Sequence, residues 1–143
     1  SSTFKDAFKN ISIGTEMKSL NSSKVYEDDR GVLYLTDIYG YANIALGDST
    51  LLSNTTGNYN TAIGFKALSS NTEGGYNIAL GHKALISNTD GWNNIALGQA
   101  TLRDNKTGSN NTAIGENTLY YNTTGNNNIA IGVGILKHNT NLK

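Results

Sequence analysis

The chain has 143 residues with no cysteine, no proline and only two histidines, and its acidic and basic side chains balance at eleven each. The absence of cysteine excludes a disulfide framework and thiolate metal sites. Proline has no N–H and interrupts ladders of backbone hydrogen bonds, so its absence suits a chain made mostly of strands and tight turns. The balanced charge provides no overall field that would attract nucleic acid, and we predict no nucleic-acid partner.

Long hydrophobic runs are also absent. No apolar run approaches the roughly 20 residues of a membrane span, so we predict no membrane insertion. No secretory signal is visible at Ser1, so an exported protein would be a mature form or a fragment. The hydrophobic fraction of 37% is low for a compact globule, where roughly 45–50% with glycine included is usual. Something other than one central core must bury surface.

One short phrase recurs six times at an interval of 17 residues, and it reads Asn, Ile or Thr, Ala, Ile or Leu, and Gly. The copies occupy residues 43–47, 60–64, 77–81, 94–98, 111–115 and 128–132. A fixed repeat of this length is typical of one structural unit stacked on copies of itself. We predict an all-β fold, a parallel β-solenoid of six 17-residue coils over residues 41–143.

Each phrase alternates with period 2, which predicts a short strand. In the first copy, Ile44 and Leu46 should point to one face and Ala45 to the other. The alanine face could be a surface that another chain approaches closely, or it could fill a narrow coil interior, and the sequence leaves both open. The alanine column is Ala45, Ala62, Ala79, Ala96, Ala113 and Ala130.

Two glycine columns predict two turns in each unit, because glycine adopts positive φ without a steric penalty. Between them runs a leucine column that begins at Leu51, which predicts the inward anchor of a second short strand, with a helical turn as the alternative. The glycines after the first strand are Gly47, Gly64, Gly81, Gly98, Gly115 and Gly132. The second column is Gly57, Gly74, Gly91, Gly108 and Gly125.

Asparagine fills two further columns. With coils stacked about 4.8 Å apart, identical amides can hydrogen-bond along the stack and hold its register. Asn also adopts the left-handed conformation and caps turns, so turn chemistry alone would select it. One column is Asn43, Asn60, Asn77, Asn94, Asn111 and Asn128, and the other is Asn54, Asn71, Asn88, Asn105, Asn122 and Asn139.

The predicted coils have a thin core, because each contributes few large aliphatic side chains. Packing several copies side by side would bury the alanine face and supply the missing core. The sequence therefore predicts that the chain associates with itself.

The phrase NTAIG at 60–64 and 111–115, with the companions AL and NTTG (54–57 and 122–125), resembles the head repeats of trimeric autotransporter adhesins. It is still more similar to the NTAIG-x-x-AL-x-x-NTTG arrays of bacterial surface and phage tail-fibre proteins. The resemblance covers about residues 40 to 141. It implies a left-handed parallel β-roll, a homotrimer about one axis, and an extracellular module on a bacterial cell surface or a virion fibre that binds a glycan or protein receptor.

Aromatic residues occupy two places in the repeat. Tyr59 and Tyr76 share a column, and Trp92 lies beside that column one coil onward. Tyr120 and Tyr121 form the second place. Exposed Tyr and Trp are favoured at recognition surfaces, so we predict that these residues bind a glycan or a protein, with shielding of the coil edge or the trimer seam as the alternative.

Residues 1–40 carry the least regular sequence, and we predict that they form degenerate N-terminal coils or a cap. Residues 10–14 repeat the strand phrase with Ser12 in the alanine column. An insertion around residues 21–30 should place Glu27, Asp28 and Asp29 on a solvated loop. Three adjacent acids lack the spaced oxygen ligands of a calcium loop, so we predict no metal site there.

Catalytic chemistry is poorly supported. His82 and His138 lie in different columns without partners, and the glycines follow the coil period instead of a phosphate-binding pattern. A carboxylate pair for hydrolysis could come from Asp90, Asp104 or Glu116 across neighbouring coils or chains, but nothing else supports an enzyme. We therefore predict no enzyme, no catalytic residue and no cofactor.

Two other functions remain open. A fibre shaft or spacer needs no binding site at all. Regular solenoids with ranks of threonine can bind ice, and one column here holds Thr55, Thr72, Thr89, Thr123 and Thr140, interrupted by Lys106.

Overall fold

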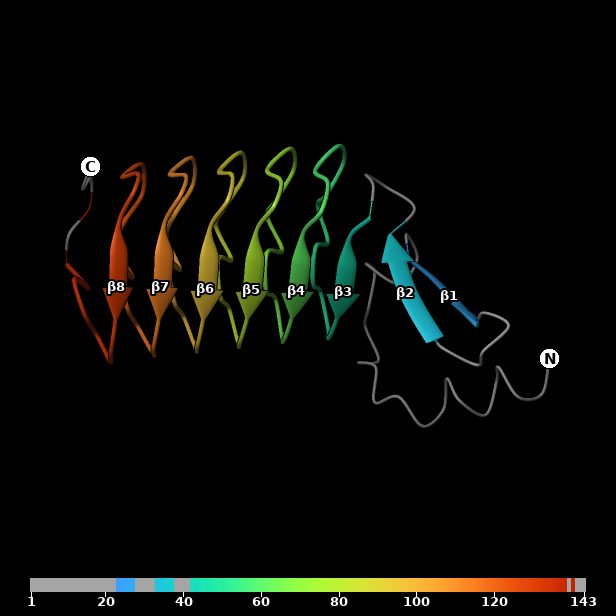
Figure 1. Ribbon diagram of the computed structural model, residues 1–143, viewed down its shortest axis with the longest axis horizontal. Helices are drawn as coiled ribbons and strands as arrows, with labels where there is room; N and C mark the ends of the chain where they lie inside the picture. Colours follow the sequence, from blue (N-terminus) through green and yellow to red (C-terminus); the bar gives the residue numbers. More distant parts are fainter. Residues whose placement is uncertain (1–22, 28–32, 38–41, 139, 141–143) are drawn as a thin grey trace.

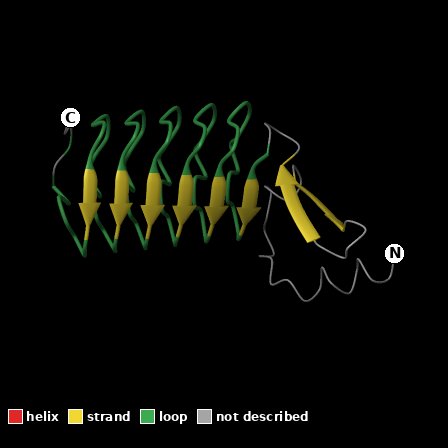
Figure 2. Ribbon diagram, in the orientation of Figure 1, coloured by secondary structure: helices red, strands yellow, loops and turns green. Residues whose placement is uncertain are grey.

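The computed structural model describes residues 23–27, 33–37, 42–138 and 140, and within them it contains eight strands and no helix (Figures 1 and 2). Strands β1 (Ser23–Glu27) and β2 (Leu33–Asp37) form a two-stranded sheet. The other six strands form one sheet in chain order: β3 (Ile44–Leu46), β4 (Thr61–Ile63), β5 (Ile78–Leu80), β6 (Ile95–Leu97), β7 (Thr112–Ile114) and β8 (Ile129–Ile131).

The six-stranded sheet is parallel and pairs like residues with like. Ala45 lies opposite Ala62, which lies opposite Ala79, and the same register continues to Ala130. The strands follow one another in a row, each connected to the next by one loop that passes behind the sheet (Figure 1). The predicted parallel β-solenoid of coils of about 17 residues is thus confirmed, with about five coils between β3 and β8.

After each strand the chain runs back in a return segment and then forms a tip loop that leads into the next strand (Figure 2). The return segment consists of consecutive tight turns, closed for example by Ala67 N–H to Gly64 O at 3.1 Å and Asn71 N–H to Leu68 O at 3.1 Å. Leu68 has a φ of 51°, which is incompatible with an extended strand. The prediction of a second short strand at the leucine column is therefore wrong.

The interior of the coils is filled by alanine from the strands and leucine from the return segments. The alanine column is 0–3% exposed, and Leu51, Leu68 and Leu85 are 0–1% exposed. Because the leucines occupy the space opposite the strand, only a methyl group fits at the alanine position. Interior filling, one of the two open interpretations, is confirmed, and the expectation that another chain packs on the alanine face is wrong.

The two glycine columns have different physical causes. Gly81 and its equivalents have φ between 122° and 138°, as predicted for a turn. Gly74 and its equivalents do not have positive φ, so the expectation for this column is wrong. A Cβ on Gly74 would lie 2.5 Å from both Gly91 O and Asn71 Oδ1, so a side chain is excluded by the close approach of neighbouring coils.

The asparagine ladders are confirmed. Asn71 Nδ2 donates to Asn54 Oδ1 at 2.9 Å, and Asn88 Nδ2 donates to Asn71 Oδ1 at 2.9 Å. In the other column, Asn77 N–H donates to Asn60 Oδ1 at 3.0 Å. The two columns meet at the second glycine, since Gly74 O accepts from Asn60 Nδ2 at 2.8 Å and from Asn71 Nδ2 at 2.9 Å. These bonds satisfy buried amides that would otherwise be costly to desolvate.

Strands β1 and β2 pair antiparallel, with Val25 opposite Leu35, and β2 lies beside β3 (Figure 1). This pairing differs from the parallel register of the coils. Glu27 is the last residue of β1, whereas Asp28 and Asp29, like residues 1–22, lie outside the described residues. A cap formed by residues 1–40 stays a prediction.

Candidate functional site

The outer face of the six-stranded sheet is aliphatic. Because the alanines point inward, the residues on either side of them point outward, and Ile44 is 45% exposed, Leu80 48% and Ile131 64%. We call this surface the sheet face. Its two ranks are Ile44, Thr61, Ile78, Ile95, Thr112 and Ile129, and Leu46, Ile63, Leu80, Leu97, Ile114 and Ile131. Neither rank holds a charged residue.

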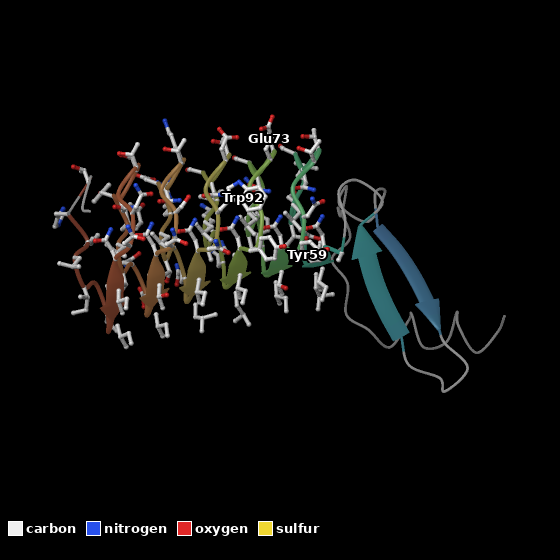
Figure 3. All side chains as sticks on the ribbon, turned by 45° about the horizontal axis from the view of Figure 1, so that its top comes forward. Tyr59, Glu73 and Trp92 are labelled. Carbon is white, nitrogen blue, oxygen red and sulfur yellow. The ribbon has the colours of Figure 1, made fainter. Side chains whose placement is uncertain are left out.

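Tyr59, Tyr76 and Trp92 form one aromatic stack, as predicted. The ring centroids of Tyr59 and Tyr76 are 4.9 Å apart, and those of Tyr76 and Trp92 are 5.8 Å apart. Gly75 makes room for the indole, because a Cβ there would lie 2.7 Å from Trp92 Cζ3. Figure 3 shows Tyr59 close to the strands and Trp92 nearer the tip loops, where Glu73 also lies. Tyr76 lies between the other two rings and is still 51% exposed, so the stack presents aromatic surface and hydroxyl groups to a partner.

The second aromatic place lies on the return segments. Tyr120 and Tyr121 meet edge to face at 4.5 Å, and Tyr121 stacks on His138 at 5.5 Å. Arg103 and Lys137 lie over the ring of Tyr120, at 5.2 Å and 5.4 Å from its centroid. These tyrosines occupy other columns than Tyr59 and Tyr76, so the structure gives two separate aromatic groups instead of one continuous surface.

The residues considered for catalysis do not converge. Asp90 belongs to a tip loop, where its Oδ1 accepts from Thr72 Oγ1 at 3.4 Å. Asp104 lies on a return segment and pairs with Arg103 at 2.9 Å. Glu116 follows β7 and is exposed, and His82 stacks on Phe65 at 5.2 Å in the same column. The described part of the chain contains no group of three His, Asp or Glu side chains that could hold a metal ion.

The threonine column proposed for ice binding lies in the tip loops. Thr55 Oγ1 donates to Thr72 O at 3.1 Å, and Thr89 Oγ1 donates to Lys106 O at 3.2 Å. These hydroxyls are therefore bonded to backbone carbonyls of the next coil. On the sheet face, threonine occurs only at Thr61 and Thr112.

A groove of about 400 Å³ runs along the return segments of four successive coils, and we did not predict it from the sequence. Its serines are Ser49, Ser53, Ser69, Ser70 and Ser87. Three of them, Ser53, Ser70 and Ser87, form a serine column in three consecutive coils, a signal that was present in the sequence. Exposed serine is so common in turns that the column alone indicates no binding.

The described residues contain no helix long and apolar enough to cross a membrane. Comparison of the chain with protein-family models, with curated proteins and with solved structures finds no match.

Proposed function

We propose that this chain is a structural and adhesive module of an extracellular fibre, in which three copies pack around one axis through their sheet faces. The observation that carries the proposal is the sheet face itself. Ile and Leu recur there in every coil although the interior does not require them. Monomeric soluble proteins rarely expose continuous apolar surfaces of more than a few hundred Å².

The thin interior supports self-association. Each coil buries one leucine and one strand alanine, whereas two larger outward residues per strand remain accessible to water. Covering the sheet face would add burial worth about 25 cal/mol for each Å² of apolar surface. Because successive coils repeat at a constant height, identical copies related by rotation about an axis parallel to the rod meet with matching residues at every level.

The number three, the left-handed winding and the extracellular setting come from the resemblance of the repeats to trimeric adhesin heads and tail-fibre arrays. In this proposal the fibre stands on a bacterial surface or a virion. The aromatic stack of Tyr59, Tyr76 and Trp92 is the contact for a cell-surface glycan or protein, since its exposed edges combine apolar area with polar groups. A shaft without a ligand is the second candidate, because the interior of the rod needs no partner molecule other than copies of itself.

Ice binding is less well supported. The hydroxyls of Thr55, Thr72 and Thr89 in this column donate to backbone carbonyls of the next coil. Lys106 interrupts the column between Thr89 and Thr123. A measurement of thermal hysteresis on the purified chain would test this alternative directly, and we expect none.

The mass of the protein in solution tests the assembly. We expect three times the 15.3 kDa of the chain by light scattering at micromolar concentration. A monomer would contradict the role of the sheet face. A dimer would keep that role and overturn the threefold arrangement.

Binding of the labelled protein to bacterial and animal cells tests adhesion. The variant in which Tyr59, Tyr76 and Trp92 are all replaced by Ala should lose cell binding and keep the trimer mass. Replacement of His82 and Val133 by Ala, two exposed residues outside the aromatic stack and outside the groove, serves as the control. Unchanged binding of the triple variant would remove the aromatic stack as the contact, and no binding by the unchanged protein would favour the shaft.

A further inference from the structure

The groove on the return segments contains side-chain hydroxyls that the coil does not use for its own hydrogen bonds. None of its five serine side chains is hydrogen-bonded to another group within the described residues. By contrast, Thr72 Oγ1 donates to Thr89 O, and Thr101 Oγ1 donates to Gly115 O at 2.7 Å. The Thr72 and Thr101 hydroxyls thus bond to the coil's own backbone, whereas those of the groove are available.

Two cationic side chains line the same groove, Lys66 in the second coil and Arg103 in the fourth. Arg103 is held in place, because its Nη1 donates to Asp104 Oδ1 at 2.9 Å and its guanidinium lies over Tyr120. A guanidinium has five N–H donors in a planar fork, so the bond to Asp104 leaves donors for a second carboxylate. The two cations are two coils apart, which is roughly 10 Å along the rod.

Apolar side chains complete the lining. Leu52, which is 42% exposed, and Ile86 lie among the serines and provide aliphatic surface. In the fifth coil Tyr120 follows Arg103 in one column, and Tyr121 follows Asp104 in the column of Ser70 and Ser87, so bulky rings take these positions. The groove is therefore confined to the first four coils and does not extend along the whole stack.

We propose that this groove binds an acidic oligosaccharide that lies parallel to the rod axis. Sugar hydroxyls would exchange hydrogen bonds with the serine hydroxyls, and the C–H faces of the rings would pack on Leu52 and Ile86. Carboxylates on sugars about two coils apart would bind Arg103 and Lys66. An extended polyhydroxylated chain fits this lining better than a peptide, because the groove offers many single hydroxyls and no exposed strand edge for backbone pairing.

This inference rests on the proposed adhesive function, for which it names a ligand class and a second site. The groove lies on the return segments, which face away from the strand because their leucines meet the strand alanines in the interior. Association through the sheet face therefore leaves the groove open. Ligand binding and trimer formation can fail independently, and measurement of both on one sample distinguishes the two proposals.

Titration calorimetry at low ionic strength tests the groove. The probes are hexasaccharides of linked uronic acids or of linked nonulosonic acids, together with the same chains after reduction of their carboxyl groups. We expect one acidic hexasaccharide to bind with a Kd in the micromolar to millimolar range, and its reduced form to bind at least tenfold more weakly. The ionic contribution should also weaken as salt is added.

Variants assign the site. Arg103→Gln should weaken binding about tenfold or more, and Lys66→Gln several-fold, while Ser70→Ala combined with Ser87→Ala should weaken it without altering its salt dependence. Lys106→Gln is the matched control, since Lys106 is an exposed cation on a tip loop outside the groove. The proposal is overturned if neither acidic hexasaccharide binds, if the reduced chains bind equally well, or if Arg103→Gln and Lys106→Gln have equal effects.

Discussion

The strand and the return segment of each coil both present side chains to water, yet their outward columns differ in composition. The strand presents only Ile, Leu and Thr in all six copies. An outward column of the return segment changes at nearly every coil, as in Leu52, Ser69, Ile86, Arg103, Tyr120 and Lys137. The coil therefore tolerates almost any residue at an exposed position. Persistent aliphatic residues on the strand must have another cause, and contact between copies of the chain is the one that we propose.

The largest effect is expected when charge is placed on the sheet face and, as a control, on the return segments. Leu80→Lys combined with Leu97→Lys puts two cations on paired positions of the sheet face. We expect the trimer to dissociate into folded monomers, because an unpaired charge buried in an interface costs about 2–5 kcal/mol. Light scattering measures the mass, and far-ultraviolet circular dichroism checks that the coils persist.

The matched control is Leu52→Lys combined with Ile86→Lys on the return segments, which should leave the trimer mass unchanged. If the sheet-face variant also remains trimeric, the two surfaces do not differ in the way proposed.

The second test concerns an inward column, where repetition has a purely geometric cause. Gly74→Ala would bring a Cβ to 2.5 Å from Gly91 O, and we expect it to destabilise the rod by about 3 kcal/mol or more. Gly134→Ala is the control, since a Cβ there meets nothing within 4 Å. Its φ of 63° should limit the cost to about 1–2 kcal/mol. Urea denaturation compares the two, and equal destabilisation would contradict the close approach at Gly74.

A slightly smaller effect is expected for the amide ladder. Asn88 donates to Asn71 Oδ1 and to Gly91 O, and it accepts from Asn105 Nδ2 at 2.8 Å. Asn88→Ala leaves buried polar groups unsatisfied, so the free energy of unfolding should fall by about 2–3 kcal/mol. Asn58→Ala, at a partly exposed position of a tip loop, should change it by less than about 0.5 kcal/mol. Similar losses in both variants would mean that the ladder adds little.

The smallest predicted effect is a gain in stability on the variable surface. Lys83 has a φ of 61°, and Asn117, in the same column, has a φ of 57°. Asn accepts the left-handed conformation more readily than Lys, so Lys83→Asn should stabilise the chain by up to about 1 kcal/mol. Thermal unfolding would detect the rise in midpoint, which Lys106→Asn, at a position without positive φ, should not reproduce. A lower midpoint for Lys83→Asn would contradict the argument.

Much of the architecture could be predicted from the sequence because a fixed period maps directly onto stacked coils. The interval of 17 residues predicted the register that pairs Ala45 with Ala62, and the position of Tyr59 relative to Tyr76 predicted their contact. The leucine column was correctly predicted to point inward. It was incorrectly assigned to a strand, because Leu has no intrinsic preference for the positive φ that Leu68 adopts.

The candidate sites were predicted less completely. The aromatic residues stand out by type, but Ser70 and Ser87 have no distinctive chemistry until they line a groove with Arg103. A free hydroxyl cannot be told from a bonded one in the sequence. Thr72 and Ser70 are two residues apart, and only the first donates to a neighbouring coil.

The sequence by itself determined the period, the order of the coils and which side chains share a column, because translation along a stack preserves position within the repeat. Only the tertiary structure decided which face of each strand points inward. It placed Ala45 inside and Ile44 outside, because the leucines of the return segments fill the interior and leave room for nothing larger than a methyl group. As a result, the aliphatic residues of the strands face outward, where we propose that other copies of the chain pack. The serines of the return segments also face outward, where we propose that a glycan binds.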